Sequence, residues 1–301
     1  MSDIVRYGII GTGMMGQEHI ANIALLEGAR VTAIADSDAG MREQGRALAP
    51  GDVRVREDYR DVIADPEVDV LVIATPNFTH FEVLQHAFAS GKHILVEKPM
   101  CTEVDDCHRV VEMAERHPAL VWVALEYRYM RSVDHLIGLV DAGAVGALRM
   151  LFIREHRNPF LVKVGDWNRF NRNTGGTLVE KCCHFFDLMH RITRRRPLRV
   201  FASGAQDVNH LDERYGGEVP DILDNAFAVV DFEDGLRGCL DLCMFAEGSP
   251  DEVEITATGD IGKVQAFEPR HEVVVSPRRG GGERRQSPLE RHIELAGWHH
   301  G

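Results

Sequence analysis

Residues 4–16 read IVRYGIIGTGMMG, a largely apolar run followed by three glycines in the pattern G-x-G-x-x-G. The run 4–10 is typical of a buried strand, and a helical pattern begins at the glycines. In such a turn Gly11 permits the tight bend, Gly13 lets the backbone approach a pyrophosphate, and Gly16 lets the helix pack closely. The stretch therefore predicts the start of a dinucleotide-binding domain. The predicted cofactor loop comprises Gly11, Thr12, Gly13, Met14, Met15 and Gly16.

An acidic residue, Asp36, follows the second predicted strand, residues 31–35. A carboxylate at this position can accept hydrogen bonds from the 2′-hydroxyl of an adenosine ribose, and it repels a 2′-phosphate. The next two residues, Ser37 and Asp38, supply no arginine for that phosphate. The sequence therefore favours NAD over NADP.

Short β-branched runs alternate with helical patterns up to about residue 125, with further strands predicted at 68–74, 93–96 and 120–125. This is the βαβ rhythm of a doubly wound parallel sheet covered on both faces, so residues 1–125 are predicted to form a Rossmann α/β domain. The run 68–74 ends at Thr75-Pro76-Asn77. Ligands of such sheets bind beyond the carboxyl ends of the strands.

The remaining residues, 126–301, show a different pattern: a helix at 133–142, then strands in succession with short turns at 233–235 and 259–260. We predict an α+β domain with a large, mainly antiparallel open sheet. The arginine and glycine cluster 278–285 is interpreted as a solvated hairpin tip rather than a phosphate site. The predicted strands are 148–155, 198–205, 226–232, 236–245, 252–257, 264–267 and 273–275.

Length and composition restrict the function. A chain of 301 residues suits two domains, and its formal charge of -13 disfavours nucleic acid as a partner. The six cysteines form no C-x-x-C pair and are expected to be reduced. With no signal-peptide pattern and no apolar run near the ~20 residues of a membrane span, we expect a cytoplasmic protein that binds a small molecule and no membrane.

Residues 175–189, GGTLVEKCCHFFDLM, place acids, a base and two thiols in one predicted helix. Its period puts Cys182, with Leu178, Phe185 and Met189, on one side, and Glu180, His184 and Asp187 on the other. Cys182 and Cys183 then point about 100 degrees apart, so no metal site is expected. Periodicity alone favours a solvated polar face for the second group.

Three segments together resemble one family: Ala74-Thr75-Pro76-Asn77 with His80, Glu97-Lys98-Pro99, and the stretch 175–189. The chain is similar to the glucose-fructose oxidoreductase and inositol dehydrogenase (Gfo/Idh/MocA) superfamily of NAD(P)-dependent enzymes over nearly its whole length. The resemblance implies oxidation of a secondary hydroxyl of a sugar or cyclitol, or the reverse ketone reduction.

The resemblance also implies roles for single residues. Lys98 reaches the substrate hydroxyl, His184 takes its proton, and Glu180 binds a substrate hydroxyl in place of the aspartate that family members commonly have. The residues that line the cofactor would be Thr75, Pro76, Asn77, His80, Glu97 and Lys98.

Substrate contacts are predicted for Arg157, Trp167 and Asn168, which are expected to border the pocket, and for Tyr127, where packing is an equal alternative. A homodimer or homotetramer through the open sheet is expected, as in the family. Relatives usually continue beyond residues 296–301, so the chain is either shortened or completes its core differently. Two other functions stay open: an NAD-dependent glycosidase that oxidises its sugar transiently, and an NAD-binding regulator without chemistry.

Overall fold

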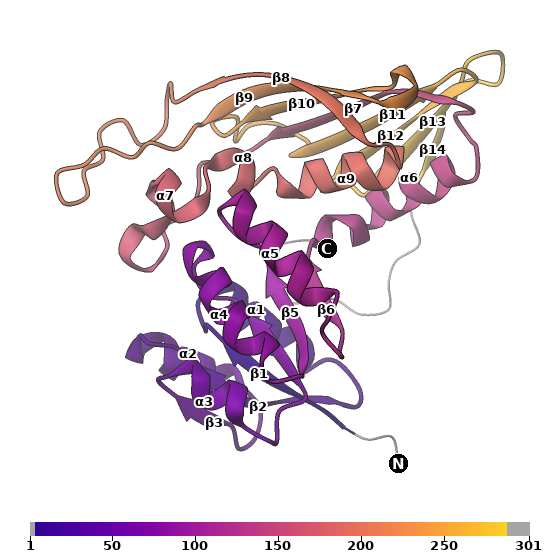
Figure 1. The fold of residues 1–301 in the computed structure, drawn as a ribbon. Helices are drawn as coiled ribbons and strands as arrows, with labels where there is room; N and C mark the ends of the chain where they lie inside the picture. Colours follow the sequence, from indigo (N-terminus) through magenta and orange to yellow (C-terminus); the bar gives the residue numbers. More distant parts are fainter. Residues whose placement is uncertain (1–3, 288–301) are drawn as a thin grey trace. The chain divides into compact units, whose positions relative to one another are not determined.

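The computed structural model describes residues 4–287, which form two compact units (Figure 1). The first contains residues 4–124 and 171–180, and the second contains residues 125–170 and 181–287. Residues 171–180 thus pack with the first unit although the chain on both sides of them belongs to the second. The shortened tail that the sequence suggested at 296–301 lies outside the described residues.

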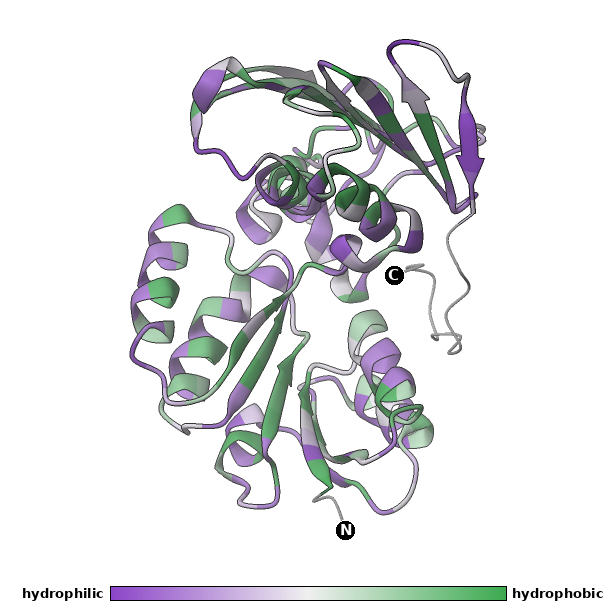
Figure 2. Cartoon of the chain, turned by 90° about the vertical axis from the view of Figure 1, so that its right-hand side faces the viewer, coloured by the Kyte–Doolittle hydropathy of each residue, from purple (hydrophilic) through white to green (hydrophobic). Residues whose placement is uncertain are grey.

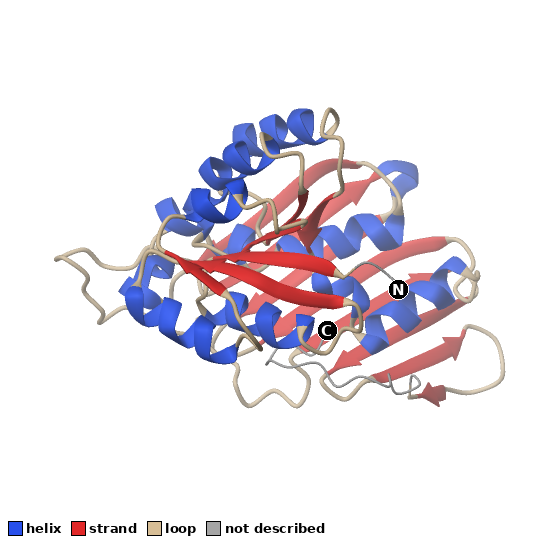
Figure 3. Ribbon diagram, turned by 90° about the horizontal axis from the view of Figure 1, so that it is seen from below, coloured by secondary structure: helices blue, strands red, loops and turns tan. Residues whose placement is uncertain are grey.

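The first unit is built on a six-stranded parallel sheet in the order β3-β2-β1-β4-β5-β6, with helices beside it (Figure 3). Each strand foreseen in this region is confirmed, and the short polar strand β3 is an addition. The neighbouring strands β1 and β4 mark the point where the strand order reverses, and cofactors bind at such a point. The strands are β1 (Val5–Ile10), β2 (Ala29–Ala35), β3 (Arg54–Arg56), β4 (Val70–Ile73), β5 (His93–Glu97) and β6 (Val121–Ala124). The helices are α1 (Met14–Ile23), α2 (Ala39–Leu48), α3 (Tyr59–Ala64), η1 (Asn77–Thr79), α4 (His80–Phe88), α5 (Val104–Ala114), α7 (Asn171–Thr174) and α8 (Thr177–Glu180).

Both faces of this sheet carry apolar side chains, which explains why helices cover both faces. Ile9 and Ile10 are adjacent on β1, so their side chains point to opposite faces, and they belong to two different core clusters. Leu71, Val72 and Ile73 on β4 are all fully buried. In Figure 2 the central strands of this sheet are mostly green, the colour of hydrophobic residues. The nearly unbroken apolar run in the sequence is therefore the mark of a strand buried on both faces.

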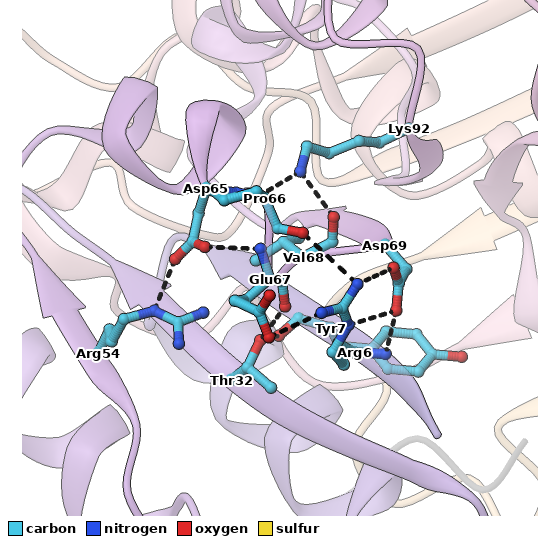
Figure 4. Close-up of polar contacts among 10 residues, drawn as sticks. All are labelled: Arg6, Tyr7, Thr32, Arg54, Asp65, Pro66, Glu67, Val68, Asp69 and Lys92. Carbon is cyan, nitrogen blue, oxygen red and sulfur yellow. Dashed lines mark hydrogen bonds and ion pairs between the residues drawn. The ribbon is translucent and has the colours of Figure 1, made fainter. Parts of the chain in front are cut away.

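Ion pairs and hydrogen bonds join the loop that precedes β4 to its neighbours (Figure 4). The Arg6 guanidinium donates to both oxygens of Asp69 at 2.9 and 2.7 Å, and it pairs with Glu67 at 2.8 Å. The Lys92 ammonium donates to the carbonyl oxygens of Asp65 and Val68. These contacts fix the loop between α3 and β4.

Replacing Asp69 with asparagine is expected to lower the melting temperature at neutral pH but not in strong acid. The hydrogen bond from Arg6 lowers the pKa of Asp69 to about 2, against the opposing effect of burial. A lowered pKa gives stability that is present above the unfolded value near 3.9 and is lost as the pH falls through about 2. Because the Asp69 side chain is 37% exposed, the contribution of the pair to stability is about 1 kcal/mol or less. Thermal unfolding at several pH values between 7 and 2 tests this, with exposed Asp52→Asn as the control; an equal deficit at every pH would contradict it.

The second unit is built on an eight-stranded sheet in the order β14-β13-β12-β11-β7-β10-β9-β8. All pairings are antiparallel except that of β7 with β10, so the mainly antiparallel sheet is confirmed. Helices α6 and α9 lie along the same side of it (Figure 1). The strands are β7 (Leu148–His156), β8 (Pro197–Ala205), β9 (Asn225–Phe232), β10 (Arg237–Cys243), β11 (Val253–Gly259), β12 (Gly262–Glu268), β13 (Glu272–Pro277) and β14 (Arg284–Gln286). The helices are η2 (Glu126–Tyr129), α6 (Arg131–Asp141), η3 (Val164–Arg169), α9 (Cys183–Thr193) and η4 (Glu233–Gly235).

The prediction of one continuous helix over residues 175–189 is wrong. Helix α8 ends at Glu180, Lys181 and Cys182 form a turn, and α9 starts at Cys183. The predicted apolar side of residues 175–189 is confirmed in part, since the Cys182 and Phe185 side chains are fully buried. The solvated polar face is wrong as well: Glu180 is only 6% exposed and His184 only 2%. Polar side chains enter the interior here because each has a polar partner, as described below.

Candidate active site and cofactor-binding residues

The glycine loop between β1 and α1 has the geometry that its pattern predicts. Gly11 has a φ of +90°, and a Cβ there would lie 2.6 Å from the carbonyl oxygen of Ala74. A Cβ on Gly16 would lie 2.0 Å from the carbonyl oxygen of Gly11, so only glycine fits. A Cβ on Gly13 would meet no atom within 4 Å. The loop is thus closed against the protein at Gly11 and Gly16 and has room at Gly13, at the amino end of α1, where a pyrophosphate can be bound.

Asp36, at the end of β2, is held beside this loop. One carboxylate oxygen accepts a hydrogen bond from the backbone N–H of Thr12 at 2.8 Å, and the other accepts from the N–H of Asp38 at 2.9 Å. Arg42, which the sequence argument did not consider, donates to the carbonyl oxygens of Asp36 and Ser37 at 2.7 and 3.0 Å. Its guanidinium therefore holds the main chain beneath Asp36.

Replacing Asp36 with alanine is expected to narrow the preference for NAD over NADP, because the change removes a charge that repels a 2′-phosphate and a group that binds the ribose 2′-hydroxyl. The measurement is kcat/KM for the two cofactors. Asp36→Asn is the matched control, since it keeps the shape and removes only the charge. An unchanged ratio in both variants would show that Asp36 does not select the cofactor.

Three of the predicted site residues, far apart in the sequence, come together in the first unit. The Lys98 ammonium donates to the main-chain oxygen of Glu180 at 3.1 Å. The Asn77 side-chain amide donates to the carboxylate of Glu180. Asn77 and Glu180 are 5% and 6% exposed. The turn after β4, the end of β5 and the end of α8 thus supply an amide, an ammonium and a carboxylate to one place.

Glu97, at the end of β5, anchors the backbone next to Lys98. One carboxylate oxygen lies 2.7 Å from the imidazole Nε2 of His19, and the other accepts from the backbone N–H of Lys98 at 3.1 Å. Burial acts to raise the pKa of Glu97, but the hydrogen bonds and charges of His19 and Lys98 together outweigh it and the pKa is lowered. The carboxylate is therefore ionised at neutral pH. His19 lies on α1 and was missed, because no motif marks it in the sequence.

His80 at the start of α4 is fully buried, and its ring nitrogens lie 2.8 and 2.9 Å from the carbonyl oxygens of Pro99 and Thr75. Burial lowers the pKa of this imidazole, against the opposing effect of the hydrogen bonds to the two carbonyl oxygens. His80 thus connects the segments after β4 and β5, which carry the predicted cofactor contacts Thr75, Pro76 and Lys98. Its direct contact with the cofactor stays a prediction.

In the second unit, His184 lies on α9 against η2. Its ring stacks on that of Tyr127, with centroids 4.1 Å apart and planes 9° from parallel. The imidazole Nε2 lies 3.4 Å from a carboxylate oxygen of Glu126. A buried imidazole beside a carboxylate can accept a proton and return it.

Lys181, Glu155 and Arg157 form a buried charged cluster beside Tyr127. Glu155 is fully buried; one of its oxygens lies 2.9 Å from the Lys181 ammonium and 3.3 Å from the Arg157 guanidinium. Of these three residues, only Arg157 was predicted from the sequence to contact the substrate. Its guanidinium is held by Glu155 and, at 3.5 Å, by Glu252. Substrate contact by Arg157 stays a prediction.

Asn168 and Trp167 lie on η3. Asn168 is fully buried, and its amide donates to the carbonyl oxygen of Leu161 at 2.9 Å. Trp167 is half-buried. Their roles toward the substrate also stay predictions.

In residues 4–287 no three histidine, cysteine, aspartate or glutamate side chains are placed to hold a metal ion.

Comparison with known proteins identifies the family. Residues 5–125 match the oxidoreductase family model described as an NAD-binding Rossmann fold, and residues 137–297 match the model of its C-terminal alpha/beta domain. The chain belongs to the GFO_IDH_MocA oxidoreductase family. The family's cofactor is NAD, and the glycine loop with Asp36 in this chain fits it.

Relatives in this family include inositol dehydrogenases. Inositol 2-dehydrogenase 3 of Saccharopolyspora erythraea is 38% identical over 158 residues, which are 52% of this chain and 46% of that protein. Myo-inositol 2-dehydrogenase of Thermotoga maritima is 28% identical over 274 residues, covering 90% of this chain and 78% of that protein. A solved structure of levoglucosan dehydrogenase with NADH has the same fold, with a TM-score of 0.85 at 20% identity over 98% of this chain and 86% of that one.

Proposed function

We propose that this oxidoreductase transfers a hydride between a secondary hydroxyl group of a sugar or cyclitol and NAD. The observation that carries the proposal is the grouping of Lys98, Asn77 and Glu180 at the carboxyl ends of β4 and β5. An ammonium, an amide and a carboxylate so placed suit a substrate with several hydroxyl groups. The inositol dehydrogenases among the relatives support the same substrate class.

Each polar group has a role in this proposal. Bound NAD supplies the hydride acceptor. Lys98 stabilises the negative charge that develops on the substrate oxygen, since an ammonium beside a forming alkoxide lowers its free energy. His184 accepts the hydroxyl proton, and Glu180 binds a neighbouring hydroxyl and orients the ring. Glu97 holds the backbone of Lys98 in place through its hydrogen bond with the Lys98 N–H.

A panel of sugars and cyclitols assayed for NADH absorbance tests the proposal. Accumulation of NADH with one or more of them is the expected result. Release of an aglycone without net NADH would instead indicate the NAD-dependent glycosidase. NAD binding without turnover of any member would indicate the regulator. Including inositols, free sugars and aryl glycosides in one panel separates the three outcomes.

We also propose a homodimer or homotetramer that forms through the open face of the second sheet. Phe201 on β8 and Val229 on β9 are register partners, and Phe227 lies two residues along β9. These side chains are 55%, 36% and 60% exposed, and a contiguous group of exposed apolar side chains is typical of an interaction surface. Sedimentation of the protein and of Phe227→Glu tests this, and the variant is expected to dissociate.

A cytoplasmic location stays a prediction. In residues 4–287 no helix has the length and apolar composition to cross a membrane.

A further inference from the structure

Lys181 is a buried lysine in the turn between α8 and α9, three residues before the proposed base. Only 4% of it is exposed. Lysine is almost never fully buried unless its charge is paired. The proposed function gives Lys181 no role. Its contacts therefore indicate why a lysine is buried here.

The ammonium of Lys181 has two partners in the second unit. It lies 2.9 Å from a carboxylate oxygen of Glu155, and it donates a hydrogen bond to the hydroxyl oxygen of Tyr127. The same nitrogen is 4.7 Å from the centroid of the Tyr127 ring. Glu155 fixes the lysine, and the lysine fixes the end of the tyrosine ring.

Tyr127 is a neutral phenol in this cluster. Burial, and then the charge of Glu155, raise its pKa well above the ordinary value. A neutral phenol oxygen is a good acceptor for an ammonium, and a hydrogen bond to a charged group is stronger than one between neutral groups. Phe185 packs edge-on against the ring with centroids 5.7 Å apart. The ring of Tyr127 is thus held at its hydroxyl and at its side.

The ring that Lys181 holds is the one on which His184 stacks, at 4.1 Å and nearly parallel. Glu126 contacts the imidazole nitrogen Nε2 at 3.4 Å. We propose that Lys181 is a positioning residue for His184 and acts through the Tyr127 ring. This inference rests on the proposed function of His184 as the proton acceptor.

The positioning role differs from simple filling of the interior. If the ion pair only stabilises the fold, its loss lowers the melting temperature and leaves the chemistry of folded protein unchanged. If it positions His184, its loss moves the imidazole, and a misplacement of about 1 Å can cost roughly 100-fold in rate. The step affected is proton transfer, so kcat changes more than KM.

Four variants and a control separate these cases: Lys181→Met, Lys181→Arg, Tyr127→Phe, Tyr127→Leu, and Lys92→Met. Lys92 also donates to backbone oxygens, but in the first unit, so its loss affects stability alone. We expect Lys181→Met and Tyr127→Leu to lower kcat about 10- to 100-fold with KM changed less than about threefold. Lys181→Arg should restore part of the rate, and Tyr127→Phe, which keeps the stacked ring, should lose less than Tyr127→Leu.

Proton NMR of the histidine ring gives a readout that needs no substrate. The stacked Tyr127 ring shifts the His184 ring protons, and His184→Asn identifies their signals. Lys181→Met and Tyr127→Leu should move these signals, whereas Lys92→Met should not. Unchanged signals in Lys181→Met, or a kcat equal to that of Lys92→Met, would overturn the positioning role.

The positioning role of Lys181 can still be tested if a variant does not fold or if the parent protein shows no turnover. If Lys181→Met does not fold, the double variant Lys181→Met with Glu155→Gln removes both charges of this ion pair, and Arg157 keeps its contact with Glu252. If the parent protein oxidises no polyol, the proposed function fails, and the NMR signals still decide whether Lys181 positions the His184 ring.

Discussion

Replacing His184 with asparagine is expected to lower kcat by about 100- to 10,000-fold, the usual contribution of a positioned acid or base. Asparagine keeps a polar group of similar size on α9 but cannot take up a proton. The pH dependence of kcat should flatten at the same time. Steady-state kinetics with the best polyol of the panel, measured over a range of pH, check both expectations.

A matched control lies on the same helix. His190 is exposed near the end of α9, so His190→Asn makes the same chemical change away from the site. It should leave kcat and its pH profile unchanged. A His184→Asn variant with nearly normal turnover would remove His184 from the chemistry. Equal losses in both variants would trace the effect to the helix rather than to the imidazole.

The first unit could be predicted well from the sequence because its signals are local. A glycine pattern after a strand specifies the turn, and apolar β-branched runs specify strands buried on both faces. Strand β3 was missed because Arg54-Val55-Arg56 is short and mostly charged. Its place in the sheet depends on pairing with β2, and residues distant in sequence determine that pairing.

The broken helix shows a limit of periodic patterns. Cys182, Phe185 and Met189 keep helical spacing and are all buried, although the backbone turns at Lys181 and Cys182. Periodicity reports which side chains face the interior, and it does not report whether the hydrogen bonds of the helix continue. The turn leaves the main-chain oxygen of Glu180 available to Lys98.

The sequence named the residues proposed for the candidate site. It did not name the residues that hold them in place. Lys98, Glu180, Asn77 and His184 follow from the family resemblance. His19, Glu155 and Lys181 do not, because the contacts of His19 with Glu97 and of Lys181 with Glu155 join positions at least 26 residues apart in the sequence. Single polar residues of this kind look like ordinary surface positions until the structure shows that they are paired.

Replacing Lys98 with methionine is expected to keep NAD affinity within about tenfold and to lower turnover by roughly 100-fold or more. The glycine loop and Asp36 are predicted to make most of the cofactor contacts, whereas an ammonium beside the reacting oxygen stabilises mainly the transition state. Methionine matches the length of the lysine stem and removes only the charge and its hydrogen bonds. Cofactor titration and steady-state kinetics measure the two effects separately.

Lys98→Arg separates charge from geometry in the same position. The guanidinium keeps the charge, but its planar fork cannot reproduce the single contact that the ammonium makes with the Glu180 main-chain oxygen at 3.1 Å. We therefore expect turnover between those of the parent and Lys98→Met. Near-normal turnover in Lys98→Met would exclude Lys98 from the chemistry. A loss of NAD affinity with kcat unchanged at saturating NAD would instead assign Lys98 to cofactor binding, because uniform binding does not raise kcat.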